Sequence, residues 1–151
     1  MEQKYEKVGS MILNPARLWK NVLAEPPRHY PVVALYNHIL DDDWVIQNII
    51  NHEWKSNPKF IVLSKTKIDV PSGVDFYSFN QLTDEDRISL WKKVDILYTR
   101  YLNLGYEAGL SGVDVIHSEV DLHVQLTNIW VGSSQRRVEA YDRTCRSLDT
   151  I

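Results

Sequence analysis

Cysteine is almost absent from this chain of 151 residues. The only one, Cys145, has no second cysteine with which to form a disulfide within the chain, so a reducing compartment is the simpler expectation. No base or second thiol near Cys145 in the sequence marks it as a nucleophile, and we predict a half-buried, inert side chain.

Long apolar runs are absent as well. No stretch approaches the roughly 18 apolar residues expected of a membrane-spanning helix. The first residues, MEQKYEKVGSMIL, mix acids with bases and contain no apolar core of a secretory signal. We therefore expect a soluble, cytoplasmic protein with no membrane span.

Positive charge is in slight deficit, with 17 Lys and Arg against 20 Asp and Glu. This balance argues against non-specific binding of nucleic acid, and we expect none. The hydrophobic fraction of 44% and the charged fraction of 25% are typical of a globular domain. Tryptophan, by contrast, is plentiful, and it is expected either in the core or on a surface that faces a partner. The five are Trp19, Trp44, Trp54, Trp91 and Trp130.

Short apolar runs alternate with stretches of helical periodicity, and this alternation predicts the fold. The runs suit buried strands, and the stretches between them predict helices. Strands that alternate with helices at this interval indicate a parallel sheet covered by helices on both faces. We therefore predict a single three-layer α/β domain with a mostly parallel sheet. The expected strands cover residues 30–36, 60–64, 74–79, 95–98 and 113–116.

Three parts are expected along the chain. Residues 1–29 form an N-terminal helical arm, with a helix start at Asn14 and Pro15. Residues 30–132 form the α/β core, and residues 133–151 form a C-terminal helix that packs on it. Within the core, residues 120–127 alternate between apolar and polar side chains, at the start of an expected edge element that covers 120–131. This alternation predicts a half-exposed strand at the sheet edge, with a bent or broken strand as the alternative.

Two groups of residues raise the question of a metal. Three acids at 41–43 precede a helical pattern, where they complement the helix dipole. His117 and His123 would share one face of the expected strand, but a third ligand would require a bend. Glu119 or Asp121 could supply that ligand only through such a bend, and no second carboxylate or His cluster stands at a fixed spacing from the three acids. We predict no metal site and no cofactor.

The densest group of candidate site residues is the stretch 103–109, NLGYEAG, which follows an expected strand and opens a helix. Free backbone N–H groups at a helix start attract phosphate, and Gly105 allows its close approach. Asn103 and Tyr106 belong to the same turn, and Glu107 can accept hydrogen bonds from sugar hydroxyls. The alternative is that Gly105 and Gly109 let the helix pack close to the sheet, with Glu107 complementing the dipole.

His38 follows the first expected strand, at the edge of the sheet where Glu107 is also expected. A histidine at this position could act as a catalytic base or as a hydrogen-bond donor to a phosphate. The alternative is a solvated histidine in a loop.

The stretch KVDILYTRYLNLGYEAGLSGVDVI, residues 93–116, resembles the nucleotide-binding half of GT-B glycosyltransferases and of the related sugar-nucleotide 2-epimerases. In that family a strand ending in a small polar residue leads into G-x-E-A, a small residue and a further strand. The resemblance extends over residues 30–116 and implies a Rossmann-like domain. It implies that phosphates lie at the start of the helix that holds Gly105 and that Glu107 binds the ribose. It also implies that the nucleobase of the ligand lies near Tyr77 and that Lys65 can reach a phosphate.

Two functions follow as expectations. The first is a nucleotide-sugar-binding subunit that resembles the donor half of a GT-B enzyme and acts with a protein partner. In that function His38 is the catalytic candidate. The second is a non-catalytic interaction or assembly protein that forms a homo-oligomer, and a viral protein is one candidate of this kind. The loop YNHILDDD lacks the small residues that phosphate binding favours, and the edge strand at 120–131 would recruit another chain.

Overall fold

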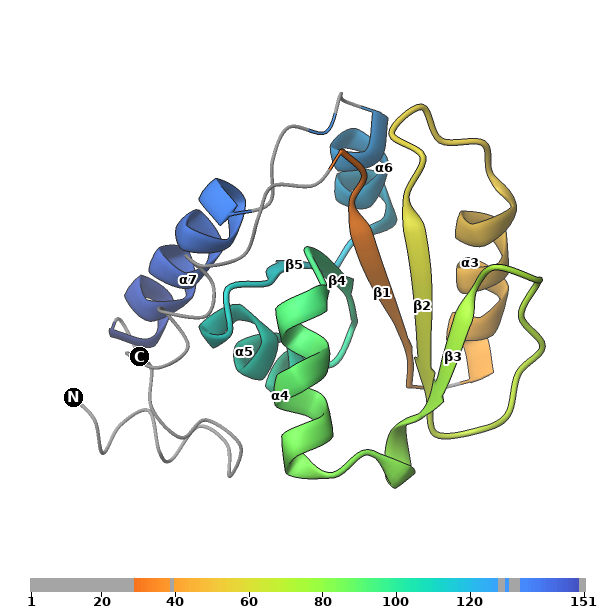
Figure 1. The fold of residues 1–151 in the computed structure, drawn as a ribbon, viewed down its shortest axis with the longest axis horizontal. Helices are drawn as coiled ribbons and strands as arrows, with labels where there is room; N and C mark the ends of the chain where they lie inside the picture. Colours follow the sequence, from red (N-terminus) through yellow and green to blue (C-terminus); the bar gives the residue numbers. More distant parts are fainter. Residues whose placement is uncertain (1–28, 39, 128–129, 131–133, 150–151) are drawn as a thin grey trace.

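The computed structural model describes residues 29–38, 40–127, 130 and 134–149 (Figure 1). Residues 1–28, which make up nearly all of the expected N-terminal arm, lie outside the described residues, as do Gly132 and Ser133.

The described residues form a five-stranded sheet in which every pair of neighbours is parallel. The spatial order is β3-β2-β1-β4-β5, so the first strand is central and the order reverses between β1 and β4. This order confirms the prediction of a Rossmann-like α/β domain. The strands are β1 (Val32–Asn37), β2 (Lys59–Ser64), β3 (Asp75–Ser78), β4 (Ile96–Tyr98) and β5 (Asp114–Ile116).

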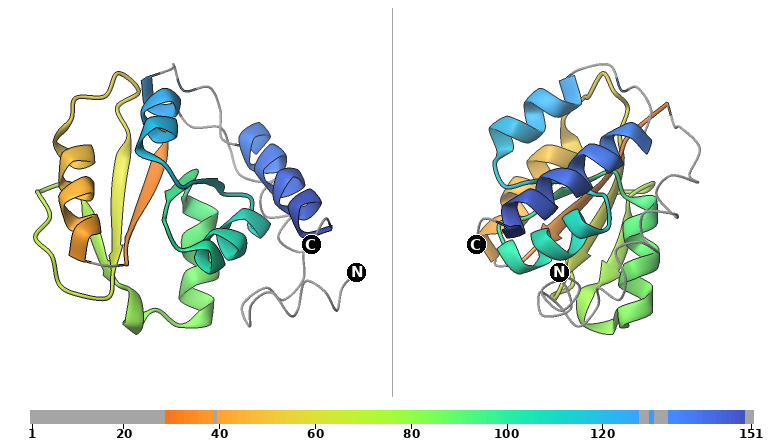
Figure 2. Two further views of the ribbon diagram at one scale, coloured as in Figure 1. Left: turned by 180° about the vertical axis from the view of Figure 1, so that it is seen from behind. Right: turned by 90° about the vertical axis from the view of Figure 1, so that its left-hand side faces the viewer.

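Helices cover both faces of the sheet (Figure 2). On one face α3 (Leu40–Asn51) and α6 (Glu119–Thr127) pack on Val33 and Leu35 of β1. On the other face α4 (Asp84–Lys93) and α5 (Leu102–Leu110) pack on Ala34 and Tyr36. Because successive side chains of a strand point to opposite faces, both faces of β1 are buried, and its sequence is a continuous apolar run.

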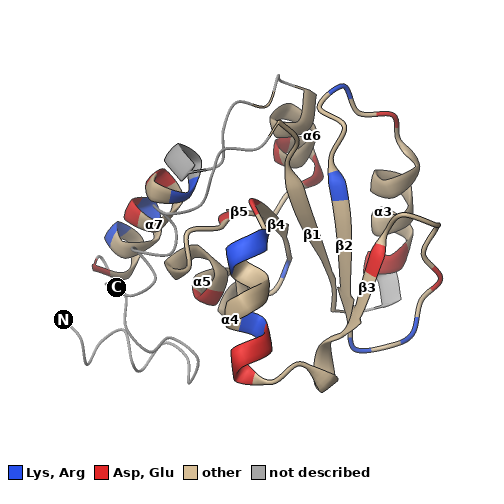
Figure 3. Cartoon of the chain, in the orientation of Figure 1, with Lys and Arg blue, Asp and Glu red and all other residues tan. Residues whose placement is uncertain are grey.

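The start of α4 shows how local sequence determines an element boundary. The Thr83 hydroxyl accepts a hydrogen bond from the Asp86 N–H at 3.1 Å, and the Asp86 carboxylate accepts one from the Thr83 N–H at 2.9 Å. Hydrogen bonding of its carboxylate to the backbone N–H and then the side chain of Thr83 lowers the pKa of Asp86. Acids lie at the start of α4 and lysines at its end (Figure 3), which complements the helix dipole. Thr83 and Asp86 thus form a capping box that starts α4.

The last helix, α7 (Ser134–Asp149), packs against α5 and the edge strand β5. Gly109 of α5 makes the close approach of the two helices possible, because a Cβ at this position would overlap the Thr144 hydroxyl. At the other end of α7, the buried Arg137 places its Nε 3.5 Å from Asp95 Oδ1. Asp95 Oδ2 accepts a hydrogen bond from the N–H of Val32 at 2.8 Å. Arg137 and Asp95 thus connect α7 to the starts of β4 and β1.

The prediction of a strand at residues 120–131 is wrong, because Glu119–Thr127 is the helix α6. Positions two apart lie about 200° apart around a helix, so the alternating apolar residues fall on opposite sides of α6, and only pairs four apart share a face. Leu122 and Leu126 face the core, whereas Val120 and Val124 are exposed. The missed signal is Ser118, whose hydroxyl accepts a hydrogen bond from the Asp121 N–H at 3.1 Å and caps the helix.

This correction removes the bare edge strand on which the expected oligomer depended. Leu126 is buried in the core, and so is Trp130, the described residue that follows α6. A charged residue at either position would therefore destabilise the core, so such a substitution cannot show whether the position lies in an interface. Among the described residues, no helix is both long enough and apolar enough to cross a membrane.

Candidate functional site

The strand order reverses between β1 and β4, and in open parallel sheets ligands bind beside the carboxyl ends of strands at such a reversal. His38 directly follows β1. Thr99, Arg100 and Tyr101 follow β4 and lead into α5. We call the edge of the sheet formed by these two segments the switch crevice, after the place where ligands bind in such sheets.

Two aromatic rings border the switch crevice. The rings of His38 and Tyr101 stack with their centroids 4.7 Å apart and their planes 6° apart. Behind them Tyr36 places its hydroxyl 3.4 Å from His38 Nδ1. His38 and Tyr101 are both exposed, so a flat aromatic surface faces the solvent at the strand reversal.

A buried carboxylate occupies the first turn of α3. Asp42 Oδ2 accepts a hydrogen bond from the His38 N–H at 3.0 Å, and Asp42 Oδ1 lies 3.4 Å from Nη1 of Arg100. Many Rossmann domains bind a phosphate at the start of the first crossover helix. A carboxylate repels phosphate, so the start of α3 is unsuited to that role.

The start of α5 differs from the start of α3 in its charge. No acidic residue lies in its first turn, and the residue that precedes it, Tyr101, makes no side-chain cap. The Tyr101 N–H instead donates to the Thr99 hydroxyl at 2.9 Å. The partial positive charge of this helix start therefore meets no side-chain carboxylate of the helix itself.

Asn37, the last residue of β1, is buried with 3% of its surface exposed. Its Nδ2 donates to the Ser64 hydroxyl at 3.0 Å. Within the described residues, Asn37 Oδ1 has no hydrogen-bond partner. A buried acceptor left unpaired costs about 1–3 kcal/mol, which a ligand that donates a hydrogen bond would recover.

Two buried tyrosines remain protonated in this environment. Burial, together with the neighbouring Tyr101 and Asp42, raises the pKa of Tyr36 to about 12. Burial also raises the pKa of Tyr98, with contributions from Glu119 and Asp42 that Arg100 opposes. Both phenols are therefore neutral at physiological pH.

The raised pKa of Tyr36 predicts a loss of stability at alkaline pH. Above the ordinary value of 10.0 the unfolded chain releases this proton while the folded chain keeps it up to about 12. Folding is therefore increasingly disfavoured across this interval, by roughly 2–3 kcal/mol at its upper end. Urea unfolding of the wild type and of Tyr36→Phe, at pH values below and within the interval, measures the effect. The variant should lose less stability than the wild type, and equal losses would contradict the prediction. Tyr30→Phe, which changes an exposed tyrosine, is the control.

The structure distributes the seven predicted site residues over four places. His38, Lys65 and Asn103 lie at the carboxyl ends of β1 and β2 and at the start of α5. Gly105 and Tyr106 line a groove between α5, β5 and α7. Tyr77 lines a groove of about 450 Å³ beside β3 and α4. The fourth place is the contact between α4 and α5, where Glu107 lies.

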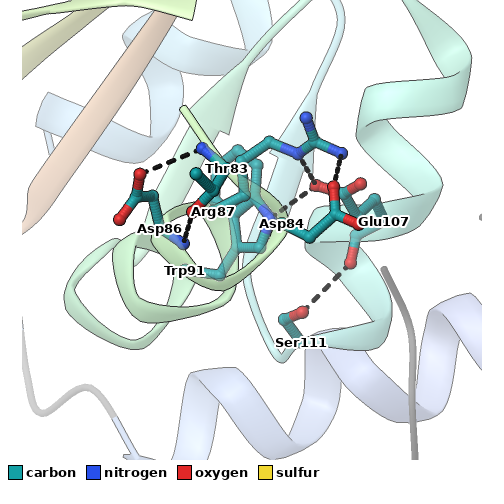
Figure 4. Close-up of polar contacts among 7 residues, drawn as sticks. All are labelled: Thr83, Asp84, Asp86, Arg87, Trp91, Glu107 and Ser111. Atoms are coloured by element: carbon teal, nitrogen blue, oxygen red, sulfur yellow. Dashed lines mark hydrogen bonds and ion pairs between the residues drawn. The ribbon is translucent and has the colours of Figure 1, made fainter. Parts of the chain in front are cut away.

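Glu107 is buried and bound from α4 (Figure 4). Its Oε2 accepts a hydrogen bond from the indole N–H of Trp91 at 2.8 Å and lies 3.3 Å from Nε of Arg87. Arg87 also lies 3.6 Å from Asp84 and stacks over the ring of Phe79. These contacts hold α4 against α5. A ribose role for Glu107 stays a prediction, and a sugar would share the carboxylate with Trp91 and Arg87.

The sequence reasoning missed the side chains that give the switch crevice its charge and shape. Arg100, Tyr101 and Asn37 lie at or directly after the ends of buried strands, which is the signal that would have identified them. His117 and His123 do not meet. His117 hydrogen-bonds to Thr99, and His123 packs on His52 and Trp54. No cluster of three or more metal-binding side chains is present in the described part of the chain.

Comparisons with protein-family models, curated proteins and solved structures found no match to this chain. The candidate site is therefore argued from its own geometry.

Proposed function

We propose that the chain binds a nucleotide sugar in the switch crevice, as the donor-binding subunit of a glycosyltransferase-like enzyme that acts with a protein partner. The observation that carries the proposal is the reversal of strand order between β1 and β4. This reversal brings the uncapped start of α5 and the unpaired Asn37 Oδ1 to the same edge of the sheet.

The diphosphate would lie at the start of α5. Backbone N–H groups there favour an anion, and no acid in the first turn opposes it. Arg100 follows β4 and Lys65 follows β2, so two cations lie at the same edge of the sheet. As the glycosidic bond breaks, these groups would stabilise the charge that develops on the leaving diphosphate.

The exposed faces of His38 and Tyr101 suit a flat ring, and stacking of a base on an aromatic side chain contributes about 1–3 kcal/mol. A hydroxyl or amine of the ligand would donate to Asn37 Oδ1. His38 would donate a hydrogen bond to the diphosphate, and the partner would supply the base that activates the acceptor.

Calorimetry against a panel of nucleoside diphosphate sugars tests this function. Wild type should bind at least one of them, and Arg100→Gln should weaken binding by about tenfold, the loss of one charge-assisted contact. Arg146→Gln changes an exposed arginine of α7 and is the matched control. The absence of binding to wild type at millimolar ligand would reject the donor site. Equal affinities in the two variants would reject the role of Arg100.

A second candidate function, assembly with another chain, rests on a different surface. Trp44 of α3 is 72% exposed, and Val120 and Val124 of α6 are 72% and 55% exposed. Both helices cover the same face of the sheet, and a groove of about 300 Å³ between them is lined by His52, Trp54 and His123. Large apolar side chains gathered on one face are typical of protein interfaces.

Light scattering over a range of concentrations tests the assembly function. Trp44→Lys should lower the apparent mass of an oligomer without changing thermal stability, because the tryptophan is largely exposed. Tyr30→Lys, which changes an exposed aromatic residue outside both helices, should leave the mass unchanged. A wild type that is monomeric at every concentration would leave this function without support.

A further inference from the structure

A groove of about 240 Å³ lies between α5, β5 and α7 and holds polar side chains that the proposed function does not use. The polar residues that line it include Tyr106, His117, Arg143, Thr144 and Ser147.

The imidazole of His117 has a defined orientation and tautomer. His117 directly follows β5, and its Nδ1 lies 2.7 Å from the backbone oxygen of Thr99. A carbonyl oxygen only accepts hydrogen bonds, so Nδ1 carries a proton, and the neutral ring keeps Nε2 as an acceptor.

Gly105 gives this ring its place beside α5. A Cβ at Gly105 would lie 3.3 Å from His117 Cε1 and 3.1 Å from Val115 Cγ1. These distances are tighter than ordinary van der Waals contact, so a larger residue would displace the imidazole. The glycine of the G-x-E-A stretch thus serves the packing of His117 as well as the helix start.

The remaining walls combine acceptors, donors and apolar surface. The Thr144 hydroxyl donates to the Ala140 carbonyl at 3.0 Å, so its oxygen faces other groups as an acceptor. Arg143 is mostly exposed and places Nη1 2.9 Å from Asp114 Oδ1. Its other N–H groups and the Tyr106 hydroxyl are donors. Leu102 and Val115 add apolar surface.

We propose that this groove binds a small, uncharged, polyhydroxylated molecule of monosaccharide size, with a ligand hydroxyl donating to His117 Nε2. Hydroxyl groups both donate and accept, which matches walls that carry both kinds of partner. An anion would meet a single cation whose charge Asp114 already offsets, and a hydrocarbon would leave the polar groups unpaired.

The volume of the groove lies below the roughly 300–1,000 Å³ of sites for drug-sized ligands. The proposal is independent of nucleotide binding in the switch crevice.

Saturation-transfer NMR on the full chain, with a pool of glucose, galactose, mannose and N-acetylglucosamine, tests the proposal. Wild type should transfer saturation to at least one sugar, and titration with that sugar should shift the ring signals of His117. His117→Phe should weaken binding at least tenfold, whereas His123→Phe, which changes another ring at a separate groove, should bind like wild type.

Three results would overturn the proposal. They are no transfer to any of the four sugars, a sugar that leaves the His117 signals unmoved, and equal binding by the two variants. The wild-type titration requires no substitution, so it gives an answer even if His117→Phe fails to fold. Calorimetry of Ser147→Ala, a change on the α7 wall of the groove, with nucleoside diphosphates separates the two sites, because that response should be unchanged.

Discussion

Replacement of Arg137 by methionine is expected to lower the free energy of unfolding by about 3–5 kcal/mol, the typical cost of removing one partner of a buried ion pair. Arg137 is 1% exposed, and its Nε lies 3.5 Å from Asp95 Oδ1. Without the guanidinium, the Asp95 carboxylate stays buried beside the start of β1 with a charge that Arg137 no longer balances. The contact that holds α7 against the domain is lost as well.

Urea denaturation followed by circular dichroism measures this effect. Arg146→Met, at an exposed position of the same helix, should change stability by no more than about 0.5 kcal/mol. The double variant Arg137→Met with Asp95→Leu should recover part of the loss, because neither charge of this pair then remains buried without the other. If Arg137→Met were as stable as Arg146→Met, the structural role of the pair would be disproved.

Replacement of Glu107 by alanine is expected to cost about 2–4 kcal/mol, since it leaves the buried indole N–H of Trp91 without its acceptor and removes the partner of Arg87. Chemical denaturation gives the magnitude, and the fluorescence of Trp91 should change with its environment. Glu85→Ala, in the exposed first turn of α4, should cost no more than about 1 kcal/mol. Equal losses in the two variants would contradict the prediction.

Glu107→Gln separates the structural role of this residue from the ribose role that the resemblance implies. Glutamine keeps an oxygen that can accept the Trp91 hydrogen bond, so the fold should be largely retained. If the variant binds nucleotide sugars like wild type, the carboxylate serves the contact between α4 and α5. A folded variant with strongly reduced affinity would support the ribose role.

The candidate site could be predicted only where local sequence carries the information. His38, Lys65 and Asn103 follow the ends of buried strands or open a helix, and these positions reach the carboxyl edge of any parallel sheet. Glu107 is different. This residue lies one to two turns into α5, and the groups that its side chain meets depend on which helix packs beside α5. That helix is α4, which contributes Trp91 and Arg87.

The sequence by itself determined the class of the fold. A run such as VVALYN can be buried on both faces only inside a covered sheet, and Thr83 with Asp86 can close a capping box through local contacts alone. Only the tertiary structure decided the strand order, the helical state of Glu119–Thr127 and the partners of Glu107 and Arg137. The alternation at 120–126 by itself favours a strand, but a helix buries Leu122 and Leu126, four residues apart, against the sheet and leaves Val120 and Val124 exposed. The partners of Glu107 and Arg137 lie 16 and more than 40 residues away, and no local periodicity encodes such distances.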